Sequence, residues 1–196
     1  MVIEGFPRSA NTFATYAFEE AQGRPVKMGN HFHSPAQFLL AAKFGVPAML
    51  VIREPVAAAL SLMVFSDGMS ARDALRRYIG FHEPLLPVRE HFVVAPFDEV
   101  IENFDAPIAR LNGRFGTAFK PFNHTRERAS ALLLRIDRER DERAGDHPDL
   151  LDNAFKKSVP SAEKSDARDA RKAELAAGDV AELRQRAAAV FQALTG

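Results

Sequence analysis

The sequence predicts an α/β fold with three layers, in which helices cover both faces of a central parallel sheet. Short apolar runs alternate along the chain with segments of helical periodicity, as they do in α/β domains. The run "PAMLVIRE" (residues 47–54) is continuously apolar up to its charged end, which is typical of a strand buried on both faces. Proline and glycine stand at the ends of the expected helices, where they start and stop them.

The first elements carry clear local signals. Residues 2–6 ("VIEGF") form a β-prone run closed by Pro7, which predicts a strand. Residues 12–21 have apolar side chains at helical spacing, and Gly23 follows them, so we expect a helix there. The run "PVKMG" (residues 25–29) predicts a second strand.

The middle of the chain continues the alternation. Residues 34–45 ("SPAQFLLAAKFG") predict a helix with a serine N-cap, a proline in its first turn and a terminal glycine. After the strand at residues 47–54, residues 55–65 predict a helix that begins with a proline. Residues 91–97 ("HFVVAPF") predict a further buried strand.

The remainder, from about residue 124, is expected to be mostly helical, and residues 1–196 to form a single domain. Residues 124–146 predict a helix whose alternating acids and bases indicate a solvated face rather than a nucleic-acid surface. Residues 156–179 are polar and are expected to be partly loop. Residues 180–196 predict an amphipathic helix.

Composition excludes several classes of function. The chain has 26 basic and 26 acidic residues, so its zero formal charge does not favour nucleic acid or an anionic membrane as a partner, and any anion site must be local. The absence of cysteine excludes disulfides, thiolate nucleophiles and cysteine-ligated metals. No leader pattern or apolar run long enough to cross a bilayer stands out, so we expect a cytoplasmic protein.

The stretch "EGFPRSANTF" has the pattern of a phosphate-binding loop without its lysine. Against G-x-x-x-x-G-K-[ST], Gly5 takes the first place, Ala10 the second glycine, Asn11 the lysine and Thr12 the hydroxyl. Arg8 is the only cation in the loop. A strand–turn–helix still offers backbone N–H groups and a helix N-terminus to an anion. The alternative is a corner that binds no ligand.

A second pair of residues points to the same edge of the sheet. Arg53 ends a predicted buried strand, where ligands of open α/β sheets bind, and Ser61 follows eight residues later in the next helix. A guanidinium and a hydroxyl brought together there would suit a second phosphate. The alternatives are a surface arginine and a serine bonded to its own helix.

"GFPRSANTF" followed by "VIREPVAAALS" resembles the sulfotransferases that use 3′-phosphoadenosine 5′-phosphosulfate (PAPS) as donor, and "VVAPFDEVIENFDAPIARLNGRFG" extends the resemblance from Val2 to about Phe119. The resemblance implies a P-loop-like sulfotransferase fold, a hydroxyl acceptor and no required metal. Arg8 would neutralise charge on the bridging oxygen. The donor-binding residues implied are Arg8, Ser9, Ala10, Asn11, Thr12 and Phe13 for the 5′-phosphosulfate, and Arg53 and Ser61 for the 3′-phosphate.

The chain departs from the family pattern in three places. Ala10 replaces a usual glycine, and Phe13 replaces a frequent tryptophan. The family's basic, glycine-containing loop over the 3′-phosphate has no full match; Lys156 and Lys157 are the best match for its cations, with a solvated charged loop as the alternative.

Two histidines are candidates for the general base. His31 and His33 follow the expected strand at 25–29, and the family's cytosolic branch has a histidine in this position. Alternation along an extended segment would point both side chains the same way, with His31 as the first choice. Surface histidines or a metal site are the alternatives, although no third ligand is evident.

Three functions remain open at this stage. The first is a sulfotransferase acting on a sugar, lipid or metabolite hydroxyl. The second is a small P-loop kinase, which Asn11 in the lysine position disfavours. The third is a nucleotide-binding module of the same fold without catalysis. The sequence does not indicate an oligomeric state.

Overall fold

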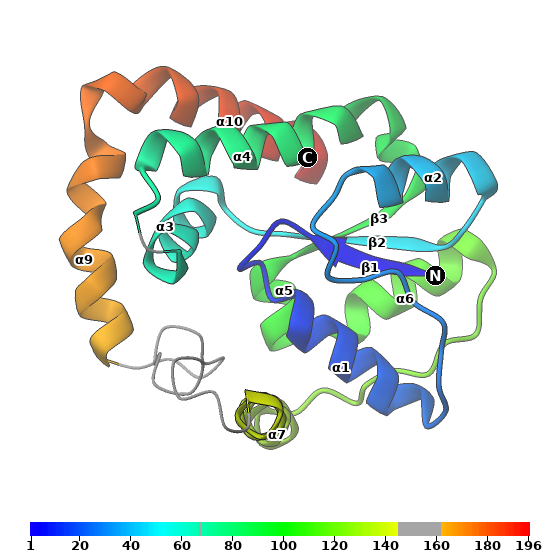
Figure 1. The fold of residues 1–196 in the computed structure, drawn as a ribbon. Helices are drawn as coiled ribbons and strands as arrows, with labels where there is room; N and C mark the ends of the chain where they lie inside the picture. Colours follow the sequence, from blue (N-terminus) through cyan, green and yellow to red (C-terminus); the bar gives the residue numbers. More distant parts are fainter. Residues whose placement is uncertain (67, 145–161) are drawn as a thin grey trace.

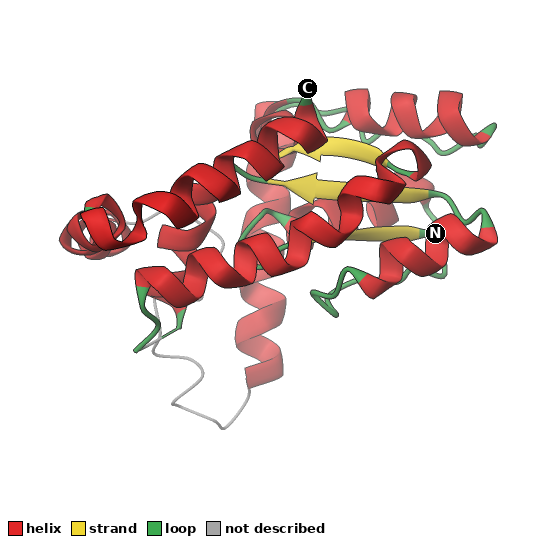
Figure 2. Ribbon diagram, turned by 90° about the horizontal axis from the view of Figure 1, so that it is seen from above, coloured by secondary structure: helices red, strands yellow, loops and turns green. Residues whose placement is uncertain are grey.

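The computed structural model describes residues 1–66, 68–144 and 162–196. Its centre is a parallel sheet of three strands in the order β1-β2-β3, which lie side by side in Figure 2. The strands are β1 (Val2–Gly5), β2 (Ala48–Ile52) and β3 (Val93–Pro96). In the register, Gly5 pairs with Val51, and Val51 pairs with Ala95. The carboxyl ends of all three strands therefore meet at one edge.

Helices cover both faces of the sheet, which confirms the three-layer prediction (Figure 1). Alternate strand residues enter two separate cores: Leu50 and Ile52 belong to one, Met49 and Val51 to the other. The first core is shared with α2 (Ala36–Phe44), α3 (Pro55–Phe65), α4 (Ala71–His82), η1 (Glu83–His91) and α10 (Ala181–Thr195). The second is shared with α1 (Asn11–Gln22), α5 (Phe97–Glu102), α6 (Asp105–Phe115) and α7 (Arg126–Ala144).

Most predicted elements are confirmed, and two details in the N-terminal half are wrong. Residues 25–29 form only an isolated bridge between Gly29 and Val2, with the Gly29 N–H bonded to the Met1 carbonyl at 3.0 Å. The predicted serine cap of α2 is also absent, because Pro35 occupies the N-cap. Ser34 Oγ instead accepts the Ala36 N–H at 3.3 Å.

The C-terminal part differs more from the prediction. Residues expected to be partly loop contain the helix α9 (Ala162–Ala176), followed by η3 (Gly178–Val180). Arg171 fastens α9 by donating to the carbonyls of Met63 (3.1 Å) and Met69 (2.7 Å), and Leu175 is buried. This docking onto α3 stabilises a helix whose sequence contains a single large apolar residue, Leu175.

Within residues 1–66, 68–144 and 162–196, no helix combines the length and apolar character that crossing a membrane requires.

A buried histidine lies beneath the start of the loop that follows β1. His82 is fully buried, and its ring packs against Tyr78 at 4.1 Å, Phe81 at 4.9 Å and Phe6 at 5.9 Å between centroids. Its Nδ1–H donates to the Tyr78 carbonyl at 2.9 Å, and its Nε2 has no partner among the described residues. Burial lowers the pKa of His82 to about 4, so the folded protein holds the neutral ring.

We expect this histidine to make the protein less stable in mild acid. Below pH 6.5 the unfolded chain binds a proton that the folded chain accepts only near pH 4, so stability falls as pH drops through this window. Linkage predicts a loss of roughly 2 kcal/mol between pH 7.5 and 5. Chemical denaturation at both pH values should show this loss in wild type and in His91→Asn, an exposed control, but not in His82→Phe. Equal losses in all three proteins would contradict the prediction.

Candidate functional site

The loop between β1 and α1 leaves a helix N-terminus free of protein anions. Arg8 and Ala10 have φ values of 68° and 72°, in the left-handed region. Ala10 is the N-cap of α1, no side chain caps the helix, and its first turn has no acidic residue. Ser9 is fully buried and its Oγ has no hydrogen-bond partner among the described residues. The first N–H groups of α1 and this hydroxyl are therefore suited to an anion.

Asn11, in the place of the P-loop lysine, stabilises the loop through buried hydrogen bonds to its backbone. Its Nδ2 donates to the carbonyls of Gly5 (2.9 Å) and Phe6 (3.0 Å), and its side chain is buried. Gly5 is required beside it, since a Cβ there would collide with the Val51 carbonyl oxygen of the neighbouring strand. Asn11 thus shapes the loop and does not supply a charge to a ligand.

Three arginines from distant parts of the chain meet beside this loop. Arg8 Nε lies 3.5 Å from the Oγ of the buried Ser61, and Arg168 on α9 approaches the same oxygen at 3.4 Å. Arg53 donates from Nη1 to the Arg8 carbonyl at 3.0 Å. The predicted proximity of Arg53, Ser61 and the loop is therefore present, and Arg168 is an addition that the sequence did not indicate.

Aromatic side chains hold two of these arginines in place. The Arg53 guanidinium stacks 4.0 Å from the ring centroid of Phe97, and the Tyr78 hydroxyl donates to the Arg53 carbonyl at 2.7 Å. Arg8 lies 4.8 Å from the centroid of Phe65. Cation–π contacts orient a guanidinium without neutralising it, so the site keeps its positive charge.

The three arginines repel one another electrostatically. Burial, followed by repulsion from Arg168 and Arg8, lowers the pKa of Arg53 to about 10. Burial, Arg168 and Arg140 likewise lower the pKa of Arg8. Within the described part of the chain, none of the three clustered arginines forms an ion pair with an acidic residue. A bound anion would relieve this repulsion, which makes the cluster a candidate anion site.

The two candidate histidines lie next to the loop, in a conformation that the sequence did not predict. His31 and His33 have φ values of 58° and 48°, so the segment is not extended and the alternation argument is wrong. Their ring centroids are nevertheless 6.0 Å apart. His33 Nδ1 lies 3.0 Å from the Gly5 carbonyl and 3.3 Å from the buried Glu4 carboxylate. His33 is therefore attached directly to the residue that begins the loop.

The remaining predicted residues are placed as follows. Phe13 is buried against Phe104 and Phe122, so its ring belongs to the core and only its backbone is at the helix start. Thr12 is half-buried in the first turn of α1. Lys156 and Lys157 lie outside the described residues. In the described part of the chain, no group of three His, Asp or Glu residues is arranged to hold a metal ion.

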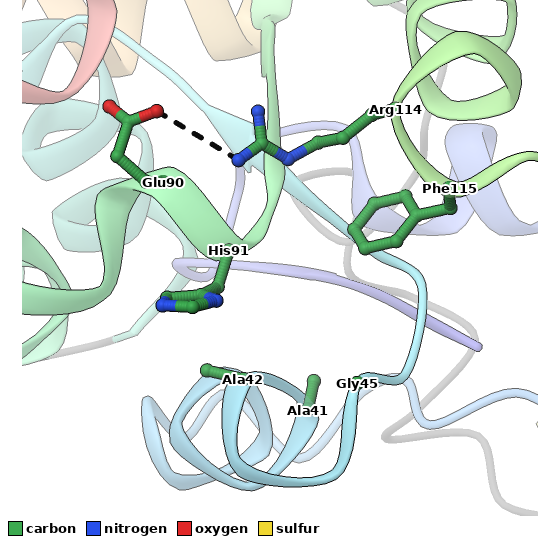
Figure 3. A pocket seen from close by; sticks show the side chains of 7 residues that line it. All are labelled: Ala41, Ala42, Gly45, Glu90, His91, Arg114 and Phe115. Carbon is green, nitrogen blue, oxygen red and sulfur yellow. Dashed lines mark ion pairs between the residues drawn. The ribbon is translucent and has the colours of Figure 1, made fainter.

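A separate hollow lies away from this chemistry, where the C-terminal ends of α2, η1 and α6 meet. Its volume is about 430 Å³, and Figure 3 shows its lining, with Glu90 and Arg114 paired at 3.8 Å. The lining residues are Ala41, Ala42, Gly45, Glu90, His91, Arg114 and Phe115. Because none of the candidate site residues borders it, the hollow does not bear on the anion site.

Ala10 offers a test of the loop conformation. A left-handed residue with a Cβ is strained by about 1–2 kcal/mol, and glycine relieves the strain while losing more conformational entropy on folding. We expect Ala10→Gly to raise the free energy of unfolding by roughly 0.5–1 kcal/mol in chemical denaturation. The control Ala21→Gly, in the right-handed last turn of α1, should lower it by up to about 1 kcal/mol. Equal losses in both variants would show that Ala10 is not strained.

No family model, curated protein or solved structure matches the chain. Function is therefore inferred from the arginine cluster, the uncapped start of α1 and the attachment of His33 to the loop.

Proposed function

We propose that the chain is a sulfotransferase that moves a sulfuryl group from PAPS to a hydroxyl acceptor, on a P-loop-like sulfotransferase fold. The observation that carries the proposal is the convergence of Arg8, Arg53 and Arg168 on Ser61 beside the free N-terminus of α1, with no protein anion paired to them among the described residues. PAPS carries anionic groups at both its 5′ and 3′ positions, which suits a site with two adjoining anion-binding parts.

The two parts of the site have distinct roles in this proposal. The backbone N–H groups that open α1, with Ser9, would hold the 5′-phosphosulfate. Arg53, Arg168 and Ser61 would hold the 3′-phosphate, and Arg8, which contacts Ser61 from the loop, would lie between the two. The absence of a lysine at Asn11 is consistent with a donor that requires no γ-phosphate transfer.

His33 is the better placed of the two histidines to act as the base. Its Nδ1 is held by the Gly5 carbonyl and Glu4, whereas burial lowers the pKa of His31 and no hydrogen bond to a described residue fixes its ring. In the reaction, the acceptor oxygen forms a bond to sulfur while the bond from sulfur to the 5′-phosphate oxygen breaks. The acceptor proton passes to the imidazole, and 3′,5′-adenosine bisphosphate leaves.

Nucleotide binding tests the donor site without an acceptor. We expect 3′,5′-adenosine bisphosphate to bind more tightly than AMP, since only the bisphosphate engages both parts of the site. At a hundredfold excess over its dissociation constant it should stabilise the protein by about 2.7 kcal/mol in a thermal-shift panel that also includes ATP. Equal affinity for AMP and the bisphosphate would contradict the two-anion site, and preference for ATP would favour a kinase.

Arg53 tests which phosphate the cluster recognises. A lysine cannot reproduce the planar fork of a guanidinium, nor its stacking on Phe97. Arg53→Lys should therefore weaken the bisphosphate much more than AMP in calorimetric titrations, and the exposed control Arg76→Lys should change neither. Parallel losses for both ligands would assign Arg53 a role in folding alone.

The base is tested by turnover of radiolabelled PAPS across a panel of hydroxyl acceptors. His33→Ala should lower turnover roughly 10²–10⁴-fold, the usual range for general-base catalysis, with little change in bisphosphate affinity. If His31→Ala produces this loss and His33→Ala does not, His31 is the base. Tight bisphosphate binding without turnover on any acceptor would indicate a binding module.

A further inference from the structure

Glu4 is a fully buried acid in the otherwise apolar strand β1, and both its oxygens are used. Oε1 accepts the Gly5 N–H at 2.9 Å. Oε2 accepts the backbone N–H groups of Phe32 at 2.7 Å and His33 at 3.1 Å, and the Gln37 side-chain amide at 3.2 Å. One carboxylate thus joins the first residue of the anion-binding loop to the segment that carries the histidines.

The same carboxylate and the Gly5 carbonyl together determine which nitrogen of His33 carries the proton. Nδ1 lies 3.0 Å from the Gly5 carbonyl oxygen and 3.3 Å from Glu4 Oε1. Both neighbours are acceptors, so Nδ1 must be the protonated nitrogen of the neutral ring. Nε2, which has no hydrogen-bond partner among the described residues, is then left with a free lone pair.

We propose that Glu4 is a positioning residue for proton transfer: it holds His33 in the Nδ1–H form beside the anion-binding loop, so that Nε2 can take the proton of the acceptor hydroxyl. This inference rests on the proposed function. When Nε2 accepts the proton, both ring nitrogens become donors, and Glu4 then lies beside a cation. The carboxylate therefore stabilises the form of His33 that arises as the bond to sulfur forms.

The charges around His33 agree with this role. The hydrogen bond that His33 donates to the Glu4 carboxylate raises the pKa of His33, with burial acting in the opposite direction and the Gly5 carbonyl and the Glu4 charge adding to the rise. Burial would raise the pKa of Glu4, but bonds from His33 and Gly5 outweigh it and keep the carboxylate ionised. The other titratable groups nearby are His31, at 6.0 Å between ring centroids, and Glu19, whose charge acts on His31.

The tautomer can be measured on the wild-type protein, without donor or acceptor. Long-range ¹H–¹⁵N correlation spectra of the histidine rings, at a pH where His33 is neutral, should show Nδ1 protonated and Nε2 free, with His33→Gln providing the assignment. Finding the Nε2–H form in the wild type would overturn the inference. This measurement does not depend on whether Glu4→Gln folds.

The variants then separate positioning from support of the fold. Glu4→Gln should make His33 titrate at lower pH, lower turnover at least about tenfold, and move the acid limb of the turnover profile to lower pH. Gln37→Met removes a different bond to the same carboxylate and should leave the His33 titration and the profile in place. The proposal is wrong if the His33 titration is unchanged in folded Glu4→Gln. It is also wrong if Gln37→Met shifts the His33 titration as much as Glu4→Gln does.

Failure of this inference is distinguishable from failure of the proposed function. If the bisphosphate does not bind, the sulfotransferase proposal fails, whatever the tautomer of His33. If the bisphosphate binds and turnover is observed, but Glu4→Gln keeps the wild-type pH profile, the function stands and only the role of Glu4 is wrong.

Discussion

The parallel register of β1, β2 and β3 is the constraint on which the candidate site depends. Because Gly5 pairs with Val51, and Ile52 with Pro96, the residues that follow each strand leave the sheet at the same edge. Arg8, Arg53 and Phe97 are brought together in this way, although they lie far apart in the sequence. The close approach of β1 and β2 also leaves no room for a side chain at Gly5.

The candidate site combines backbone strain with repulsion between like charges, and the rest of the fold must offset both. Two residues with a Cβ adopt left-handed backbone in the loop and two more in the histidine segment, each at a cost of about 1–2 kcal/mol. The clustered arginines are partly desolvated and repel one another. The two cores that cover the sheet supply the compensating burial.

Two histidines near the carboxyl edge of the sheet, His82 and His33, differ in their surroundings. His82 is packed among aromatic rings, and burial outweighs its bond to the Tyr78 carbonyl, so the ring remains neutral below the loop. His33 lies beside an ionised carboxylate and is partly exposed, so its charged form is favoured. The same side chain therefore serves as an apolar filler in one place and as a candidate proton acceptor in the other, because burial and partners decide its charge.

The sequence by itself predicted the α/β class, the three strands and the helices α1, α2, α3, α7 and α10, whereas α4 and η1 were not predicted. Their apolar periodicity and their proline and glycine boundaries are local, so they can be recognised without knowledge of the fold. It also placed Arg8, Arg53 and Ser61 at one edge, since the ends of parallel strands must converge. The strand predicted at residues 25–29 is not formed, because only Gly29 makes a bridge to β1.

Only the tertiary structure decided how the site is completed. Arg168 is one charge among many in a polar segment, and it reaches Ser61 because Arg171 and Leu175 dock α9 on α3. Glu4 carries no local signal in its strand, and folding buries it against the backbone of Phe32 and His33. The left-handed residues His31 and His33 flank Phe32, and the N–H groups of Phe32 and His33 both donate to that carboxylate. Such contacts join residues that are distant in the chain, so no local pattern encodes them.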